Sequence, residues 1–72
     1  MRKIKKKQVI LSDREIEILQ EIADGKSVIE IAIIFEITES TARRHVVNIL
    51  VKLDAHTKAA AVAEGFRRNL LK

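Results

Sequence analysis

The sequence predicts an all-α domain built from four helices. Three observations support this prediction. The 72 residues include no Pro and only two Gly, the apolar residues recur at helical spacing, and a Ser or Thr precedes each apolar segment. A small sheet would need turn residues that are absent here. Because there is no Cys for disulfides or thiolate metal ligands, stability has to come from packing, helix capping or a partner chain.

The first helix is predicted over residues 13–24. Ser12 stands at its N-cap and Glu15, three residues on, completes a capping box, while Leu11 and Ile16 are spaced to close a hydrophobic staple. Gly25 supplies the left-handed residue that ends the helix.

The second and third helices are predicted over residues 28–36 and 39–53. Ser27 and Glu30 form another capping box, and Thr38 caps the third helix. The third helix carries one apolar face, which consists of Ala42, Val46, Ile49, Leu50 and Leu53. A connection this short predicts two helices at a large angle, as in a helix-turn-helix.

The fourth helix is predicted over residues 58–68, with Thr57 as its cap and Asn69 in a left-handed position after it. Val62 and Phe66 are expected to face the core, and Gly65 inside the helix indicates close packing. The remaining small side chains predict a smooth surface on which a second copy can dimerise, although alanine also simply favours helix. This predicted interface consists of Ala59, Ala60, Ala63 and Arg67.

Charge is segregated along the chain, whose net charge is +4. Residues 1–8 carry five bases and no acid, residues 9–42 carry eight acids and two bases, and residues 43–72 carry seven bases and two acids. This pattern favours an anionic partner for the last third, unless the two signs merely screen one another. No apolar run reaches the roughly 18 residues of a membrane span, so a cytoplasmic protein is expected, located at the nucleoid when bound to DNA.

Residues 1–10 are interpreted as a basic N-terminal arm and residues 11–72 as the domain. The arm either follows DNA phosphates or a minor groove without sequence preference, or is a solubilising tail. Its basic residues are Arg2, Lys3, Lys5, Lys6 and Lys7.

The face of the third helix opposite its apolar side is the candidate DNA-binding surface. A helical wheel at about 100° per residue places Ser40, Arg44, Val47 and Val51 there, flanked by Arg43, Thr41, Asn48 and Lys52. We expect base contacts from Arg43, Arg44 and Val47, because Arg pairs with guanine and Val touches a thymine methyl. Phosphate contacts are expected from Ser27, Thr41, Asn48 and Lys52. The alternative for the two arginines is a solvated basic face.

Several blocks of the sequence resemble the LuxR-type, or GerE-like, helix-turn-helix domain. The blocks are Leu11-Ser-Asp-Arg-Glu-Ile-Glu-Ile-Leu, Ile22-Ala-Asp-Gly-Lys-Ser, Glu30-Ile-Ala, Ile37-Thr-Glu-Ser-Thr-Ala-Arg-Arg-His-Val-Val-Asn-Ile-Leu-Val-Lys-Leu and Ala61-Val, and the resemblance covers residues 11–71. It implies a four-helix domain that binds double-stranded DNA through the third helix in the major groove. It further implies base contacts at the positions of Arg43, Arg44 and Val47, a structural His45, and a homodimer through the fourth helix. Two third helices would then lie about 34 Å apart, on an inverted repeat.

The sequence departs from the family pattern at two kinds of position. Glu36 and Asp54 stand where the family has Gly, so each has to adopt a positive φ or reshape its turn. Apolar residues occupy positions that the family fills with polar ones, and they cannot all be buried in so small a core. These residues are Ile16, Val28, Ile29, Ile33, Ile34, Val47 and Val51.

Two functions of different classes follow. The first is a sequence-specific DNA-binding transcriptional regulator. The second is a protein-interaction module of the same fold, which binds or antagonises a larger regulator through apolar surfaces on the second or fourth helix. Helices one to three also resemble the DNA-binding domain of sigma factors, but the capped fourth helix favours the LuxR type. His45 and His56 have no ligand partners at metal-binding spacing, and no Ser-His-acid arrangement is visible. We therefore expect no metal, no cofactor and no enzymatic activity.

Overall fold

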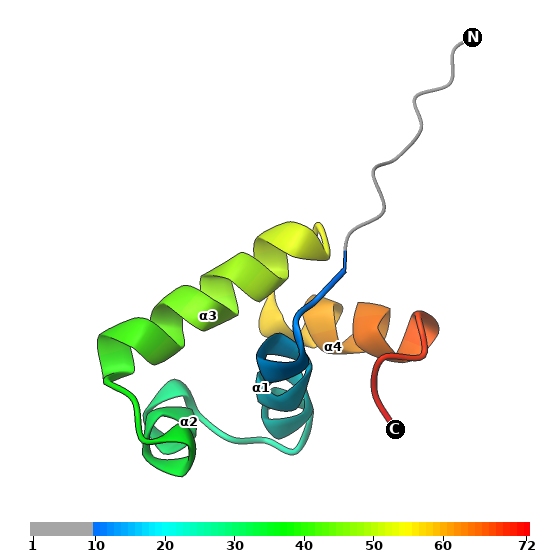
Figure 1. Cartoon of the computed structure of the whole chain (residues 1–72). Helices are drawn as coiled ribbons and strands as arrows, with labels where there is room; N and C mark the ends of the chain where they lie inside the picture. The colour runs from blue at the N-terminus through cyan, green and yellow to red at the C-terminus, as the bar shows by residue number, and fades with distance from the viewer. Residues whose placement is uncertain (1–9) are drawn as a thin grey trace, which may run out of the picture.

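The computed structural model describes residues 10–72, which contain four helices and no strand. The helices are α1 (Asp13–Ala23), α2 (Val28–Phe35), α3 (Glu39–Lys52) and α4 (Lys58–Arg67) (Figure 1). The predicted all-α, four-helix class is confirmed. Each predicted helix extends one residue past its observed end, into the C-cap. The predicted basic residues of the arm lie outside the described residues.

All four helices begin at the caps that the sequence predicts. The hydroxyl oxygens of Ser12, Ser27, Thr38 and Thr57 each accept a hydrogen bond from the backbone N–H three residues further on. In α1 and α2 the capping box is complete, because the third residue is a glutamate whose carboxylate accepts from the cap's own N–H. Since each cap contributes about 1 kcal/mol, the helix starts are fixed by local sequence.

The connections turn at residues in the left-handed conformation. Glu36, which ends α2, has a φ of 56°, and Asp54, after α3, has a φ of 55°. These two residues therefore adopt a positive φ, at positions where the LuxR-type pattern has Gly. This conformation costs a residue with a side chain about 1–2 kcal/mol. Asn69 has a φ of 61°, so the predicted left-handed residue after α4 is confirmed.

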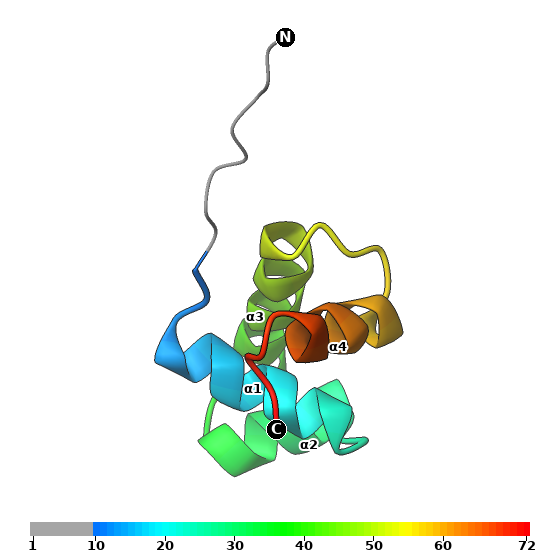
Figure 2. The same cartoon turned by 90° about the vertical axis from the view of Figure 1, so that its right-hand side faces the viewer.

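The helices are arranged around α1. Helix α2 packs against the N-terminal half of α3, while α4 packs on the other side of α1 (Figures 1 and 2). Helix α3 also contacts α1 and, near its end, α4. One side of α3 and the outer sides of α2 and α4 therefore remain on the surface.

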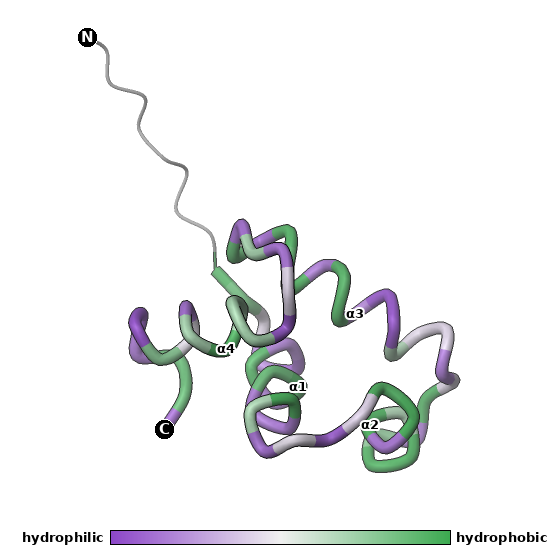
Figure 3. Tube along the Cα trace, turned by 180° about the vertical axis from the view of Figure 1, so that it is seen from behind, coloured by the Kyte–Doolittle hydropathy of each residue, from purple (hydrophilic) through white to green (hydrophobic). Residues whose placement is uncertain are grey.

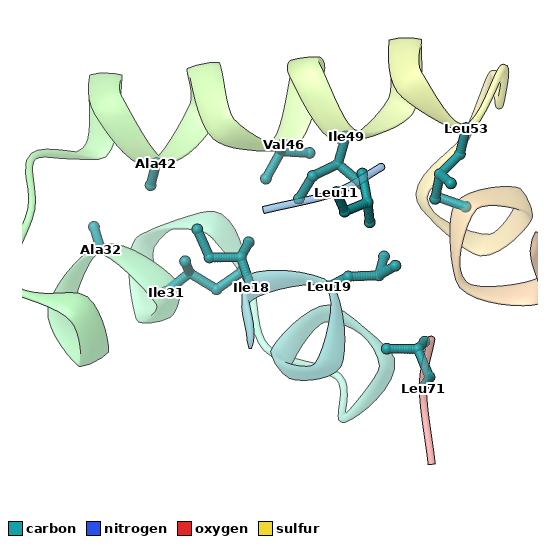
Figure 4. Packing of buried hydrophobic residues seen from close by; sticks show 11 residues of the cluster. Leu11, Ile18, Leu19, Ile31, Ala32, Ala42, Val46, Ile49, Leu53 and Leu71 are labelled. Atoms are coloured by element: carbon teal, nitrogen blue, oxygen red, sulfur yellow. The ribbon is translucent and has the colours of Figure 1, made fainter. Parts of the chain in front are cut away.

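The core lies where α1, α2 and α3 meet and extends to α4 (Figure 4). Its largest fully buried side chains are Ile18 and Leu19 from α1, Ile31 from α2 and Ile49 from α3. The remaining buried apolar residues are Leu11, Ala32, Ala42, Val46, Leu53, Ala61 and Leu71.

The predicted core face of α4 is wrong in one respect. Phe66 is 46% exposed and Val62 is half-buried, whereas Ala61 and Gly65 are buried against α1. A Cβ at Gly65 would lie 2.9 Å from Leu71 Cδ1 and 3.0 Å from Leu19 Cδ2. The close packing that Gly65 indicates is therefore packing within the chain, and it turns the aromatic side chain of Phe66 outward.

Candidate nucleic-acid interface

The exposed side of α3 carries the side chains that the helical wheel predicts. Ser40, Arg44, Val47 and Val51 are exposed, as are the flanking Arg43 and Asn48, while Thr41 and Lys52 are half-buried. The opposite side packs on the core through Ala42, Val46, Ile49 and Leu53. Because these four buried residues anchor α3 to the core, the backbone that carries the exposed side chains is held in place.

The two arginines of this face have different surroundings. Arg43 forms an ion pair with Glu39, one helical turn before it, and both side chains are well exposed. Within residues 10–72, Arg44 has no ion-pair partner. A surface pair of this kind contributes less than about 1 kcal/mol, so Arg43 can exchange Glu39 for another acceptor at small cost. Arg44 can bind an acceptor without first breaking an ion pair within residues 10–72.

Lys52 is engaged with α1. Its Nζ lies 2.9 Å from Oε1 and 3.2 Å from Oε2 of Glu15, whose side chain is only 8% exposed. The same carboxylate accepts the Ser12 N–H at 2.8 Å. Lys52 thus joins the end of α3 to the start of α1, and its charge is largely balanced by Glu15. It lies at the rim of the α3 face, where one ammonium proton can still point to solvent.

Burial raises the pKa of the Glu15 carboxyl. The hydrogen bond and charge of Lys52, together with the Ser12 hydrogen bonds, lower this pKa, and their combined effect is larger than that of burial. The net result is a pKa below the ordinary value of 4.5. A carboxyl with a lowered pKa stabilises the fold above the unfolded-state pKa, and this stabilisation is lost as the pH falls through the folded-state pKa.

We therefore expect Glu15→Gln to flatten the loss of stability below pH 4.5, in unfolding titrations followed by circular dichroism between pH 7 and pH 3. At neutral pH the variant should be less stable, because the buried side chain at position 15 then accepts weaker hydrogen bonds from Lys52 and the Ser12 N–H. Lys52→Met should also flatten the acid dependence, and the double variant should add little. An acid dependence in Glu15→Gln as steep as that of the wild type would contradict this role.

The helix N-termini differ in what they offer a phosphate. At α2, the Ser27 N–H donates to Glu30 Oε1 at 2.8 Å, and this contact is the largest cause of a lowered Glu30 pKa. A phosphate near Ser27 would have to compete with that carboxylate. At α3, Thr41 Oγ1 accepts from the Thr38 hydroxyl at 2.9 Å, which leaves the Thr41 hydroxyl proton free to donate outward.

The outer side of α4 carries an apolar stripe formed by Ala59, Ala63 and Phe66, all exposed and spaced four and three residues apart. Sequence reasoning missed Phe66 because it assigned this residue to the core. Ala60 and Arg67 are exposed beside the stripe, and Arg67 pairs with Glu64. A groove of about 440 Å³ adjoins the stripe, and its lining includes Ile22, Ala59 and Val62.

Both histidines of the chain lie within the described residues. His45 is half-buried and His56 is exposed. Among residues 10–72, no three His, Cys, Asp or Glu side chains are grouped as a metal ion would require. None of the helices α1 to α4 is long and apolar enough to cross a bilayer.

Comparison with known proteins gives consistent results. A family model described as "Bacterial regulatory proteins, luxR family" matches residues 9–64. The quorum-sensing regulator RhlR of Pseudomonas aeruginosa is 58% identical over 55 residues, which are 76% of this chain and 23% of RhlR. The response regulator VraR of Staphylococcus aureus is 45% identical over 62 residues, which are 86% of this chain and 30% of VraR. The chain thus spans less than a third of the length of these relatives.

Solved structures show the same likeness. The transcription factor GerE superposes with a TM-score of 0.81 at 34% identity, covering 86% of this chain and 92% of GerE. The response regulator ChrA of a heme-sensing two-component system superposes with a TM-score of 0.83 at 37% identity, covering 90% of this chain and 32% of ChrA.

Proposed function

The chain belongs to the luxR family of bacterial regulatory proteins, and we propose that it is a sequence-specific DNA-binding transcriptional regulator that reads the major groove with α3. The observation that supports this reading best is the exposed side of α3, where Arg44 has no ion-pair partner among the described residues and stands beside Arg43 and Val47. Because duplex DNA is the proposed ligand, we place its action in the cytoplasm, at the nucleoid.

In the proposed complex, the side chains of α3 divide into base readers and phosphate contacts. The Arg44 guanidinium donates two hydrogen bonds to O6 and N7 of a guanine, and Val47, three residues on, packs against a thymine methyl. Arg43 joins them after leaving Glu39. Thr41 and Asn48 donate to phosphate oxygens and fix the register of the helix. Lys52 and Ser27 contribute less than their residue types imply, because both are already bonded to glutamates.

We further propose that two copies pair through the α4 stripe. Ala59, Ala60 and Ala63 allow a partner helix to approach closely, and Phe66 and Arg67 extend the contact toward the end of α4. A two-fold dimer places its α3 helices about one DNA turn, roughly 34 Å, apart and binds an inverted repeat. The stripe is short and rich in alanine, so we expect this dimer to form chiefly on DNA.

Binding to a labelled duplex, measured by fluorescence anisotropy at two salt concentrations, tests the proposal. We expect micromolar or tighter affinity that falls at least tenfold between roughly 50 and 200 mM salt, because cationic side chains displace counterions from several phosphates. A truncated chain without residues 1–8 is the control, and it should retain the sequence preference while losing part of the salt dependence. Absence of binding at low salt would refute the proposed function.

A second candidate function rests on α2. Three isoleucines are exposed on this helix, as expected for a module that binds another protein. If the chain acts only as a protein-binding module, it should not bind duplex DNA. Substitutions of the exposed α2 isoleucines should then weaken its association with a protein partner.

A further inference from the structure

The two halves of α3 differ in charge. The first half carries Glu39, Arg43 and Arg44, whereas Lys52 is the only charged residue among residues 46–52. Figure 3 shows the same change along the helix, from mainly hydrophilic colouring in the first half to mainly hydrophobic colouring in the second. The formal charge in the second half of α3 is therefore that of Lys52 alone, and it is the charge that Glu15 faces.

The pair of Lys52 with Glu15 is harder to break than the pair of Arg43 in the first half of the helix. When Arg43 leaves Glu39, water can solvate the exposed carboxylate that remains. When Lys52 leaves Glu15, the carboxylate that remains is 8% exposed and has lost its counter-charge, which is costly. The Ser12 N–H donates to the same carboxylate at 2.8 Å and holds it in place. Lys52 therefore does not exchange Glu15 for a phosphate.

Glu15 carries a full negative charge at neutral pH. Although burial raises its pKa, the hydrogen bond and charge of Lys52 and the bonds to Ser12 keep this pKa below the ordinary value of 4.5. The carboxylate oxygens lie 2.9 Å and 3.2 Å from Lys52 Nζ. A DNA phosphate that approaches the second half of α3 therefore meets a pair of charges whose sum is zero.

We propose that Glu15 is a counter-charge that keeps Lys52 neutralised when DNA binds, and that it thereby lowers the affinity for duplex DNA of any sequence. This role rests on the proposed function. Phosphate contacts carry no sequence information, so a smaller phosphate contribution leaves a larger share of the affinity to the base readers Arg43 and Arg44. Glu15 is a positioning residue, because it acts on DNA only through Lys52.

Fluorescence anisotropy of a labelled mixed-sequence duplex, titrated between roughly 50 and 200 mM salt, tests this role. Glu15→Gln should bind at least about threefold more tightly than the wild type at the lower salt concentration, and its slope of log affinity against log salt should be steeper by about one. Lys52→Met should bind more weakly by a similar factor, because Glu15 is then unbalanced. The Glu15→Gln/Lys52→Met variant removes both charges and should return close to the wild type.

The direction of the effect separates this role from a structural one. Glu15→Gln is expected to be less stable than the wild type and yet to bind DNA more tightly, whereas a loosened contact between α1 and α3 would weaken binding. Glutamine also completes a capping box with Ser12, so the start of α1 is retained. Circular dichroism at the temperature of the titration checks that each variant is folded. If Lys52→Met does not fold, Glu15→Gln and the double variant still decide the result.

The matched control is Glu21→Gln, which removes one negative charge from the same helix. Glu21 is also paired with a lysine, but this lysine, Lys26, lines the groove beside α4, so the affinity should change less than about twofold. Three results would each overturn the role of Glu15: no gain in Glu15→Gln, an equal gain in the control, or a large loss in the double variant. If the wild type binds the duplex, such a result leaves the proposed function intact. If no variant binds, both the proposed function and this role are refuted.

Discussion

Replacing Arg43 and Arg44 together with alanine should weaken the binding of duplex DNA by at least about 100-fold. Each arginine that pairs with a guanine contributes about 1–3 kcal/mol of binding energy, and the two stand side by side on the outer face of α3. The single Arg44→Ala change should account for the larger part, because Arg43 has to leave Glu39 before it can bind DNA. Fluorescence anisotropy at fixed salt measures both effects.

The matched control removes the same charge elsewhere. An Arg14→Ala/Arg68→Ala variant lowers the net charge equally, but its changes lie on α1 and at the end of α4. We expect it to lose only the small, sequence-independent part of the affinity. If the α3 double variant bound DNA as tightly as this control, α3 would not be the reading helix. Loss of binding on removal of residues 1–8 would then point to the arm.

Ile49→Ala should destabilise the fold by about 2–5 kcal/mol. Ile49 is fully buried between α3 and α1, and a domain of this size has a total stability of about 3–5 kcal/mol. We therefore expect the variant to be largely unfolded near 37 °C, as measured by urea unfolding followed by circular dichroism. Val51→Ala on the same helix is the control, because its side chain is 72% exposed and its loss should cost under about 0.5 kcal/mol. Similar losses in both variants would contradict the assigned core.

The helices could be predicted from the sequence because their ends depend on neighbouring residues. Ser12 with Glu15, and Ser27 with Glu30, form bonds within three residues, so the pattern is visible along the chain. The buried side of α3 was also predictable, since its apolar residues lie on one stripe. The left-handed Asn69 follows from its position after α4 and its residue type.

What the sequence does not reveal depends on contacts between distant residues. Phe66 is the largest apolar side chain of α4 and was expected inside, but the small Ala61 and Gly65 allow α4 to lie close to α1, and Leu71 fills the remaining space. The partnership of Glu15 with Lys52 joins residues 37 positions apart, so a basic residue expected to contact phosphate is also a link between two helices. How far Lys52 is held by Glu15, and how far it can contact phosphate, depends on the packing of α1 against α3.

The return of the chain after α4 has a practical consequence. Asn69, in the left-handed conformation, reverses the direction of the backbone. Leu71 then packs against Gly65 and Leu19. The Lys72 N–H donates to Gln20 Oε1 at 3.4 Å. The last residue thus emerges beside α1, on the side away from α3 (Figures 1 and 2). A fluorophore, a surface tether or a fused reporter attached at Lys72 would project away from the α3 face and leave it open to a duplex.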